Sequence, residues 1–98
     1  MSGRPSRACR VDGNQAEIVG QLRQIGATVQ SMASVGDGCP DLLVGLNGRN
    51  YVFEVKEDGK GLRPRQVMWF GEWKGQANVV TCFADCLEAI NAGVRQTK

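Results

Sequence analysis

The sequence has no histidine and no long apolar run. The first absence argues against a structural zinc site, and the second argues against a membrane-spanning segment. None of its four cysteines forms a Cys-x-x-Cys pair, so we expect no structural zinc site, which needs closely spaced cysteine or histidine ligands. No stretch approaches the ~20 apolar residues that span a bilayer, and no apolar segment follows the basic N-terminus as it would in a secretory signal. We therefore expect no membrane association, free thiols and a cytoplasmic location.

The chain of 98 residues is long enough for one domain. We predict a flexible basic arm over residues 1–11 and a single domain over residues 12–98. The formal net charge is only +2, but basic side chains gather in two groups. The members of these groups are Arg4, Arg7 and Arg10 in the first, and Lys60, Arg63, Arg65 and Lys74 in the second. Either group could contact phosphates, or could simply be solvated surface.

The spacing of apolar residues and turn formers predicts an α/β fold. The expected order is helix, three strands, helix, strand, helix, which implies a mixed β-sheet flanked by helices. The predicted elements are a helix from about 12–14 to 26, strands over 28–34, 41–46 and 51–56, a helix over 64–75, a strand over 78–83 and a helix over 84–94.

Asn47-Gly48 lies between two apolar strands and is a strong hairpin signal. If these two residues form the turn, Leu46 pairs with Arg49 and Asp41 pairs with Glu54. Directly opposed residues share a face, with Cβ atoms about 4.5–5.5 Å apart, and Lys56 points to the same face as Glu54. A four-residue turn would keep the three together, whereas a three-residue turn would put Asp41 on the other face.

Two facing carboxylates and a lysine are suited to phosphodiester hydrolysis. The carboxylates of Asp41 and Glu54 repel each other unless a cation lies between them, and Mg²⁺ prefers such oxygen ligands. The backbone carbonyl of Val55 could also reach the metal. Lys56 could stabilise negative charge that develops on the phosphate or help to orient the attacking water. The competing interpretation is a cross-strand charge cluster on a solvated sheet face.

The pattern Pro40-Asp41 followed by Glu54-Val55-Lys56 resembles the PD-(D/E)XK nuclease superfamily. More narrowly, residues 14–92 resemble a stand-alone, phage-type virus-type replication-repair nuclease (VRR-Nuc) domain. The resemblance implies a restriction-endonuclease-like fold whose element order is the one predicted above. It also implies that Asp41 and Glu54 are metal ligands and that Lys56 is the catalytic base or a stabiliser of developing charge.

Two further residues match positions of the family pattern. Glu17, on the first predicted helix, corresponds to a glutamate that often joins the metal site, and Gln66 corresponds to a glutamine at the start of the second helix. Without the resemblance, Glu17 is an exposed residue favoured by the helix dipole, and Gln66 is a polar first-turn residue. Trp69 and Trp73 could belong to the core or to a dimer face, and we expect the core.

The resemblance implies a Mg²⁺- or Mn²⁺-dependent endonuclease that hydrolyses branched DNA such as four-way (Holliday) junctions. It further implies a homodimer, and the cytoplasm of a bacterial host if the protein is encoded by a phage. Lys60, Arg63 and Arg65 are then candidates for DNA binding. The alternatives are a nuclease for flaps, forks or linear duplex, or a catalytically silent module that binds DNA.

Overall fold

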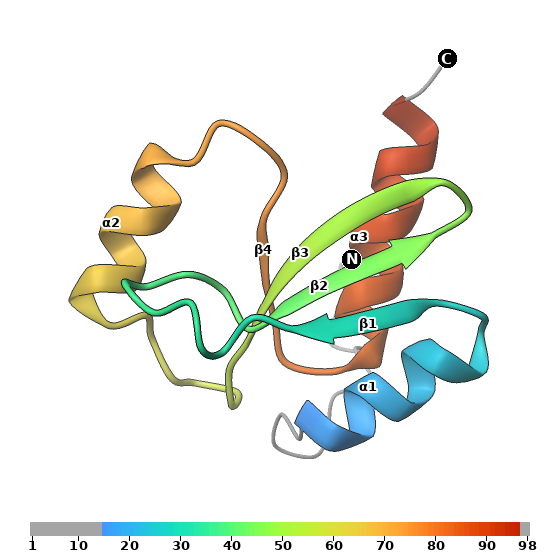
Figure 1. The fold of residues 1–98 in the computed structure, drawn as a ribbon, viewed down its shortest axis with the longest axis horizontal. Coiled ribbons are helices and arrows are strands. Elements are labelled where there is room, and N and C mark those ends of the chain that lie inside the picture. Colours follow the sequence, from blue (N-terminus) through green and yellow to red (C-terminus); the bar gives the residue numbers. More distant parts are fainter. Residues whose placement is uncertain (1–14, 97–98) are drawn as a thin grey trace, which may run out of the picture.

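The computed structural model describes residues 15–96, and the arm predicted over residues 1–11 lies outside the described residues. The described elements follow the predicted order of helix, three strands, helix, strand, helix, which confirms the α/β fold class (Figure 1). They are α1 (Gln15–Gln24), β1 (Thr28–Ser31), β2 (Leu42–Leu46), β3 (Arg49–Val55), α2 (Pro64–Glu72), β4 (Asn78–Val80) and α3 (Phe83–Gln96). None of these helices has the length and apolarity that a membrane span requires.

The four strands form one mixed sheet in the order β1-β2-β3-β4. The first three strands are antiparallel neighbours, and β4 runs parallel to β3. Leu46 pairs with Arg49, so the turn contains two residues as predicted. Asn47 and Gly48 both have positive φ angles, of 55° and 80°, which is the backbone that a tight hairpin turn of this twist requires.

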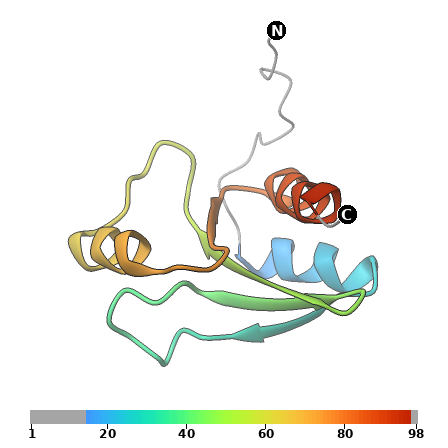
Figure 2. The same ribbon diagram turned by 90° about the horizontal axis from the view of Figure 1, so that it is seen from above.

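Helices α1 and α3 cover the same face of the sheet and form the core with it (Figure 2). In β2 and β3, alternate residues point to this face, and Leu42, Val44 and Phe53 are at most 1% exposed. The buried apolar residues of the core are Ile18, Leu22, Ala27, Leu42, Val44, Tyr51, Phe53, Val80, Cys86 and Ile90. The removal of these apolar side chains from water is the main stabilising contribution in a small domain.

Several element boundaries differ from the prediction. Strand β4, for example, ends at Val80 rather than at residue 83, and three other differences have a visible structural cause. Strand β1 ends at Ser31 rather than at residue 34, because the chain turns away after Met32 donates its N–H to the Asp41 carbonyl. Helix α2 ends at Glu72 rather than near residue 75, because Trp73 takes an extended conformation. Strand β3 begins at Arg49, since a two-residue turn lets pairing start at once.

Helix α2 lies apart from the core (Figures 1 and 2). None of its residues is buried. Trp69 is half-buried and Trp73 is 47% exposed, and the two rings stack with centroids 4.6 Å apart. The expectation that both tryptophans belong to the core is therefore wrong, because α2 does not pack on the face that α1 and α3 cover.

The cysteines follow the prediction only in part. Cys39 and Cys86 are free thiols, and Cys86 is a buried core residue with its pKa raised to about 12 by burial. Cys82 is disulfide-bonded, so the expectation of a free thiol is wrong at that position.

Candidate active site

The candidate site lies where β2 begins and β3 ends, beside the first turn of α2. Asp41 directly precedes β2, and Leu42 pairs with Phe53, so the same register continues to Asp41 opposite Glu54. The Oδ2 atom of Asp41 accepts a hydrogen bond of 3.0 Å from the N–H of Val55. The Asp41 side chain therefore takes a position that the backbone of a longer β2 would occupy, and it closes the end of the hairpin ladder.

The backbone of Val55 faces this same edge of β3. The N–H and C=O of one strand residue point to the same side of the strand. Because the Val55 N–H donates to Asp41, the Val55 carbonyl is directed to the side on which Asp41 lies. The neighbouring Lys56 N–H points the other way and donates a hydrogen bond of 2.9 Å to the Val80 carbonyl of β4.

Glu54 is a buried carboxylate with only part of its hydrogen-bonding capacity used. The residue is 2% exposed. Its Oε2 atom accepts a hydrogen bond of 2.9 Å from Gln66 and lies 3.7 Å from the Nζ of Lys56, whereas its buried Oε1 atom has no hydrogen-bond partner in the described structure. Burial raises the pKa of Glu54, and the nearby Asp41 carboxylate raises it further, against the lowering effect of Lys56 and Gln66. The site thus holds negative charge that one lysine and one amide do not fully compensate.

Gln66 connects this carboxylate to the start of α2. Its Oε1 atom accepts the backbone N–H of Arg63, over 2.8 Å, and its Nε2 atom donates to Glu54. Because the amide oxygen and the amide nitrogen each have a partner of the matching kind, the orientation of the side chain is fixed. Sequence reasoning on Gln66 left two interpretations open, a polar first-turn residue and a site residue. Gln66 lies in the first turn of α2 and contacts Glu54, which is compatible with both interpretations.

The segment that leads to Asp41 packs against the start of α2. Gly38 has a φ of +81°, and a Cβ at this position would overlap the backbone carbonyl of Arg65. The guanidinium of Arg65 lies 3.3 Å from the exposed carboxylate of Asp37. A glycine is required here both for the backbone conformation and for the close approach.

Cys39 is a neighbour of the site that sequence reasoning missed. Burial raises the pKa of its thiol, and so do the charges of Glu54 and Asp41, which places the thiol near both carboxylates. The available signal was its position two residues before Asp41, since residues two apart in an extended segment point to the same side.

The structure does not bring the remaining predicted residues into this group. Within residues 15–96, no three Asp, Glu, Cys or His side chains are close enough to hold a metal ion together, so Glu17 is not gathered with Asp41 and Glu54. Glu17 is exposed on α1, and α1 packs on the core face, whereas side chains adjacent to Leu42 and Phe53 point to the opposite face.

The predicted DNA-binding residues are all exposed near the site. Arg63 is the N-cap residue of α2, and Arg65 follows in its first turn. Lys60 lies in the loop before α2, with its Nζ 3.6 Å from the carboxylate of Glu57.

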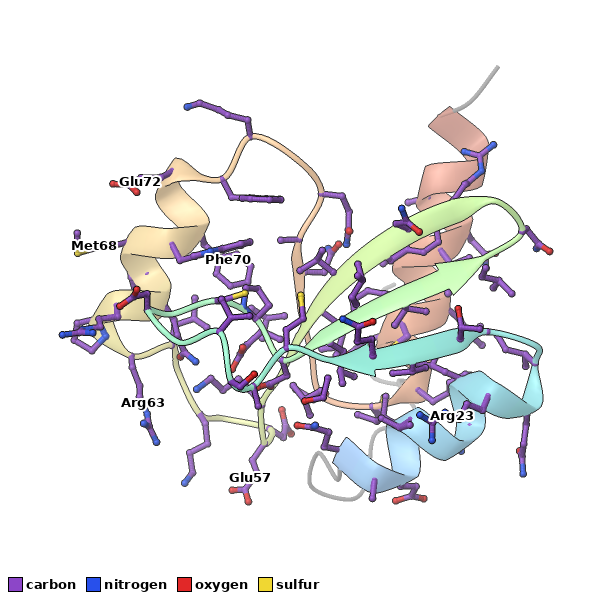
Figure 3. All side chains as sticks on the ribbon, viewed as in Figure 1. Arg23, Glu57, Arg63, Met68, Phe70 and Glu72 are labelled. Carbon is purple, nitrogen blue, oxygen red and sulfur yellow. The ribbon has the colours of Figure 1, made fainter. Side chains whose placement is uncertain are left out.

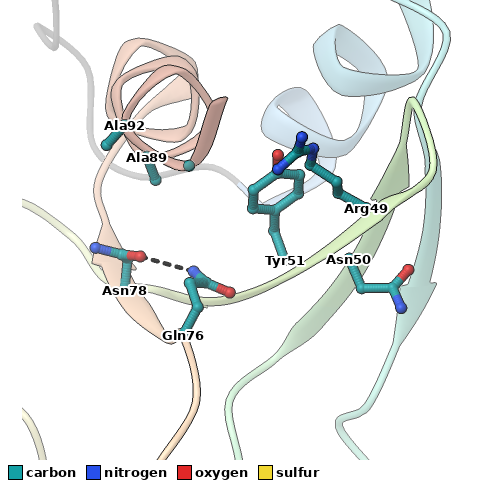
Figure 4. Close-up of a pocket in the computed structure, with 8 residues that line it drawn as sticks. Arg49, Asn50, Tyr51, Gln76, Asn78, Ala89 and Ala92 are labelled. Carbon is teal, nitrogen blue, oxygen red and sulfur yellow. Dashed lines mark hydrogen bonds between the residues drawn. The ribbon is translucent and has the colours of Figure 1, made fainter. Parts of the chain in front are cut away.

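A separate hollow of about 390 Å³ lies at the opposite end of β3 (Figure 4). The residues that line it are Arg49, Asn50, Tyr51, Gln76, Asn78, Ala89, Ala92 and Gly93. The Gln76 amide donates to Asn78 and to the Val52 carbonyl and accepts the Val52 N–H. The hollow contains none of the predicted site residues, and the Gln76 amide is already used in extending the edge of the sheet.

A solved structure described as a VRR_NUC domain is similar to this chain. The TM-score is 0.62 and the sequence identity is 25%, and the match covers 79% of this chain and 89% of that chain. No protein-family model and no curated protein sequence matches the chain. The fold is thus that of a VRR_NUC domain, which supports the predicted nuclease class and is consistent with the PD-(D/E)XK superfamily.

Proposed function

We propose that the protein is a metal-dependent DNA endonuclease in which Asp41 and Glu54 hold Mg²⁺ or Mn²⁺. The observation that carries this proposal is the Glu54 carboxylate, which is buried, has an unpartnered Oε1 atom and lies beside a second carboxylate. A buried polar atom without a partner costs free energy, typically about 1–3 kcal/mol. A cation bound at this oxygen would remove that cost and reduce the repulsion between the two acids.

The donor set suits a hard divalent cation. Mg²⁺ is usually held by one or two carboxylates and keeps several waters, so two acids are enough without a third protein carboxylate. The Val55 carbonyl, directed toward the Asp41 side of the strand, is a further oxygen donor. When bound, the metal would polarise a phosphate oxygen and lower the pKa of a water molecule.

Lys56 and Gln66 complete the site around Glu54. Lys56 lies beside the Glu54 carboxylate with 14% of its side chain exposed, so it can extend an ammonium group toward a phosphate at the surface. This position favours stabilisation of developing negative charge over action as a base. Gln66 donates a hydrogen bond to the Oε2 atom of Glu54, so Oε1 is the oxygen that would remain available to bind the metal.

The proposed substrate is branched DNA such as a four-way junction, and the proposed active form is a homodimer. Both follow from the resemblance to stand-alone VRR-Nuc domains, and two equivalent sites would suit paired cuts on a symmetric junction. Lys60, Arg63 and Arg65 are exposed around the site and are proposed to contact phosphates.

The proposal is tested with a panel of labelled four-way junctions, flaps, forks and linear duplexes, in Mg²⁺ and in Mn²⁺. We expect Asp41→Ala and Glu54→Ala to lower cleavage by about 100-fold or more, as removal of a charge-stabilising group does in other enzymes. Glu88→Ala, which removes an exposed carboxylate from α3, is the matched control and should cut normally. Equal cleavage by Asp41→Ala and wild type would contradict the proposal, and DNA binding without cleavage in either metal would favour the silent module.

Glu17→Ala belongs in the same panel. A loss of activity comparable with that of Asp41→Ala would assign Glu17 to the metal site in the DNA complex. Normal activity would leave it as an exposed residue of α1, as the structure has it.

A further inference from the structure

Helix α2 carries an apolar stripe on the side that faces away from the sheet. Pro64, Val67, Met68 and Gly71 follow the i, i+3, i+4, i+7 spacing of one helix face. Val67 is 54% exposed and Met68 is 63% exposed. Figure 3 shows Met68 and Glu72 on this outer side, whereas Phe70 points toward the rest of the molecule. We refer to Pro64, Val67, Met68 and Gly71 as the outer stripe.

A helix of this kind needs something to cover it. Helix α2 has nine residues, and isolated helices shorter than about 12–15 residues are marginal, because most helical stability in proteins comes from packing. Its inner side carries Trp69 and Phe70, which are only half-buried. A helix that is apolar on both sides is typical of a buried helix, yet none of the residues of α2 is buried in the single chain.

The charges of α2 indicate what covers it. Arg65 lies in the first turn, where the helix dipole disfavours a cation, and Glu72 lies in the last turn, where it disfavours an anion. A second α2 packed antiparallel against the first would place each Glu72 beside the basic first turn of the other helix. Arg65 already lies 3.3 Å from the exposed Asp37 of its own chain, so a contact with the second copy would add to that ion pair, and Glu72 would gain a cationic neighbour.

We propose that the outer stripe is the contact surface for a second copy of this chain. The two α2 helices pack antiparallel about a two-fold axis between Val67 and Met68, so that each Gly71 faces the Pro64 of the other copy. Apart from its chain neighbours and its own helix backbone, no atom lies within 4 Å of a Cβ built at Gly71, so the glycine leaves room for close approach of a second helix. Arg65 and Glu72 lie on the same flank of the stripe by helical periodicity, which allows an ion pair between copies.

This inference deepens the homodimer part of the proposed function by assigning its surface. Gln66 is on the inner side of the same helix and contacts Glu54. The interface and each active site are then separated by about one helix diameter, roughly 10 Å. The stripe itself offers no side-chain charge or hydrogen-bond donor, which argues against DNA as its occupant.

The test measures oligomeric state by analytical ultracentrifugation over a concentration series, with Val67→Asp compared with Val35→Asp. Val35 is 61% exposed but lies in the segment between β1 and β2, so it is a matched control for an exposed valine. We expect wild type and Val35→Asp to form dimers, and Val67→Asp to raise the dimer dissociation constant by about 10-fold or more. A wild-type monomer at all concentrations, or equal effects of the two substitutions, would overturn the inference.

A charge exchange tests the antiparallel arrangement. Glu72→Arg should weaken the dimer by about two- to fivefold, because it faces Arg65 of the second copy, and adding Arg65→Glu to the same chain should restore it. Rescue by the double substitution requires that the two positions meet between copies, whereas a double variant weaker than Glu72→Arg would overturn the arrangement. Cleavage by a strictly monomeric wild type would refute this interface and leave the nuclease proposal standing. A dimer without nuclease activity would refute the nuclease proposal and leave the interface standing.

Discussion

The two halves of this domain are held together by different kinds of interaction. In one half, α1, α3 and the core face of the sheet exclude water from a set of apolar side chains that are nearly all less than 7% exposed. In the other half, α2 contributes no buried residue, and specific contacts such as those of Gln66 with Glu54 and Gly38 with Arg65 position it. Apolar burial is non-directional, whereas hydrogen bonds and close backbone approaches fix geometry. The half that is weakly packed is therefore the half in which specific contacts fix the positions of single atoms around Glu54.

The same substitution in the two halves gives the largest expected difference. Phe53→Ala removes a ring that is 0% exposed, and we expect it to lower the free energy of unfolding by about 3–5 kcal/mol. Phe70→Ala removes a half-buried ring of α2 that contacts Trp69 edge-on, with ring centroids 5.3 Å apart, and we expect a loss of about 1–2 kcal/mol. Urea unfolding at one fixed protein concentration measures both. Equal losses would mean that α2 is part of the core after all.

Substitutions of Gln66 can separate its hydrogen bond to Glu54 from its hydrogen bond to the first turn of α2. Gln66→Glu keeps an oxygen that accepts the Arg63 N–H, but it cannot donate to Glu54. We expect cleavage to fall by about 10–100-fold, in the range seen when a group that orients a metal ligand is removed, with little change in helix content. Gln66→Ala should lower cleavage similarly and also reduce helix content, as measured by circular dichroism. Full activity of Gln66→Glu would show that the hydrogen bond to Glu54 is not needed.

The sequence predicts the secondary structure of both halves, but it does not predict which helix is buried. The hairpin register was predicted because an Asn-Gly turn and a period of two residues leave few alternatives once the turn length is known. The helix at α2 was also predicted, since helical spacing and Pro64 indicate a helix start. Its lack of burial was not, because an apolar pattern shows that a face needs covering and cannot show whether this chain covers it.

The site itself divides in the same way. The convergence of Asp41 with Glu54 depends on local register and was predictable. The contact of the Gly38 segment with α2 joins segments 27 positions apart through backbone shape, which no periodicity reports. Cys39 follows Gly38 in this segment and lies near both carboxylates.

Two glycines with similar backbone angles test whether that contact matters. Gly38 has a φ of +81° and meets the Arg65 backbone, whereas Gly48 has a φ of +80° and open space around its missing Cβ. Gly48→Ala should cost only the strain of the left-handed conformation, about 1–2 kcal/mol, with normal cleavage. Gly38→Ala should cost more and should also lower cleavage, because the segment must move away from α2. If the two variants have the same stability in urea and the same cleavage rate, the contact between Gly38 and Arg65 does not contribute to the site.

The smallest effect we expect is on the pH dependence of stability, and it concerns the charge on Glu54. The pKa of Glu54 in the folded protein is raised, chiefly by burial and then by Asp41, above the ordinary glutamate value of about 4.3 that applies when the chain is unfolded. Between these two pKa values the folded state binds more protons, so the free energy of unfolding decreases as pH rises through this window.

Glu54→Gln removes this titration and should flatten the decrease, with a difference of about 1 kcal/mol or less between variant and wild type at neutral pH. Glu88→Gln, at an exposed glutamate of α3, should leave the wild-type slope in place. A cation at Glu54 favours the ionised carboxylate, so added Mg²⁺ should raise the melting temperature of wild type and not that of Glu54→Gln. The same slope in wild type and Glu54→Gln, together with equal responses to Mg²⁺, would mean that Glu54 is neither electrostatically strained nor a metal ligand.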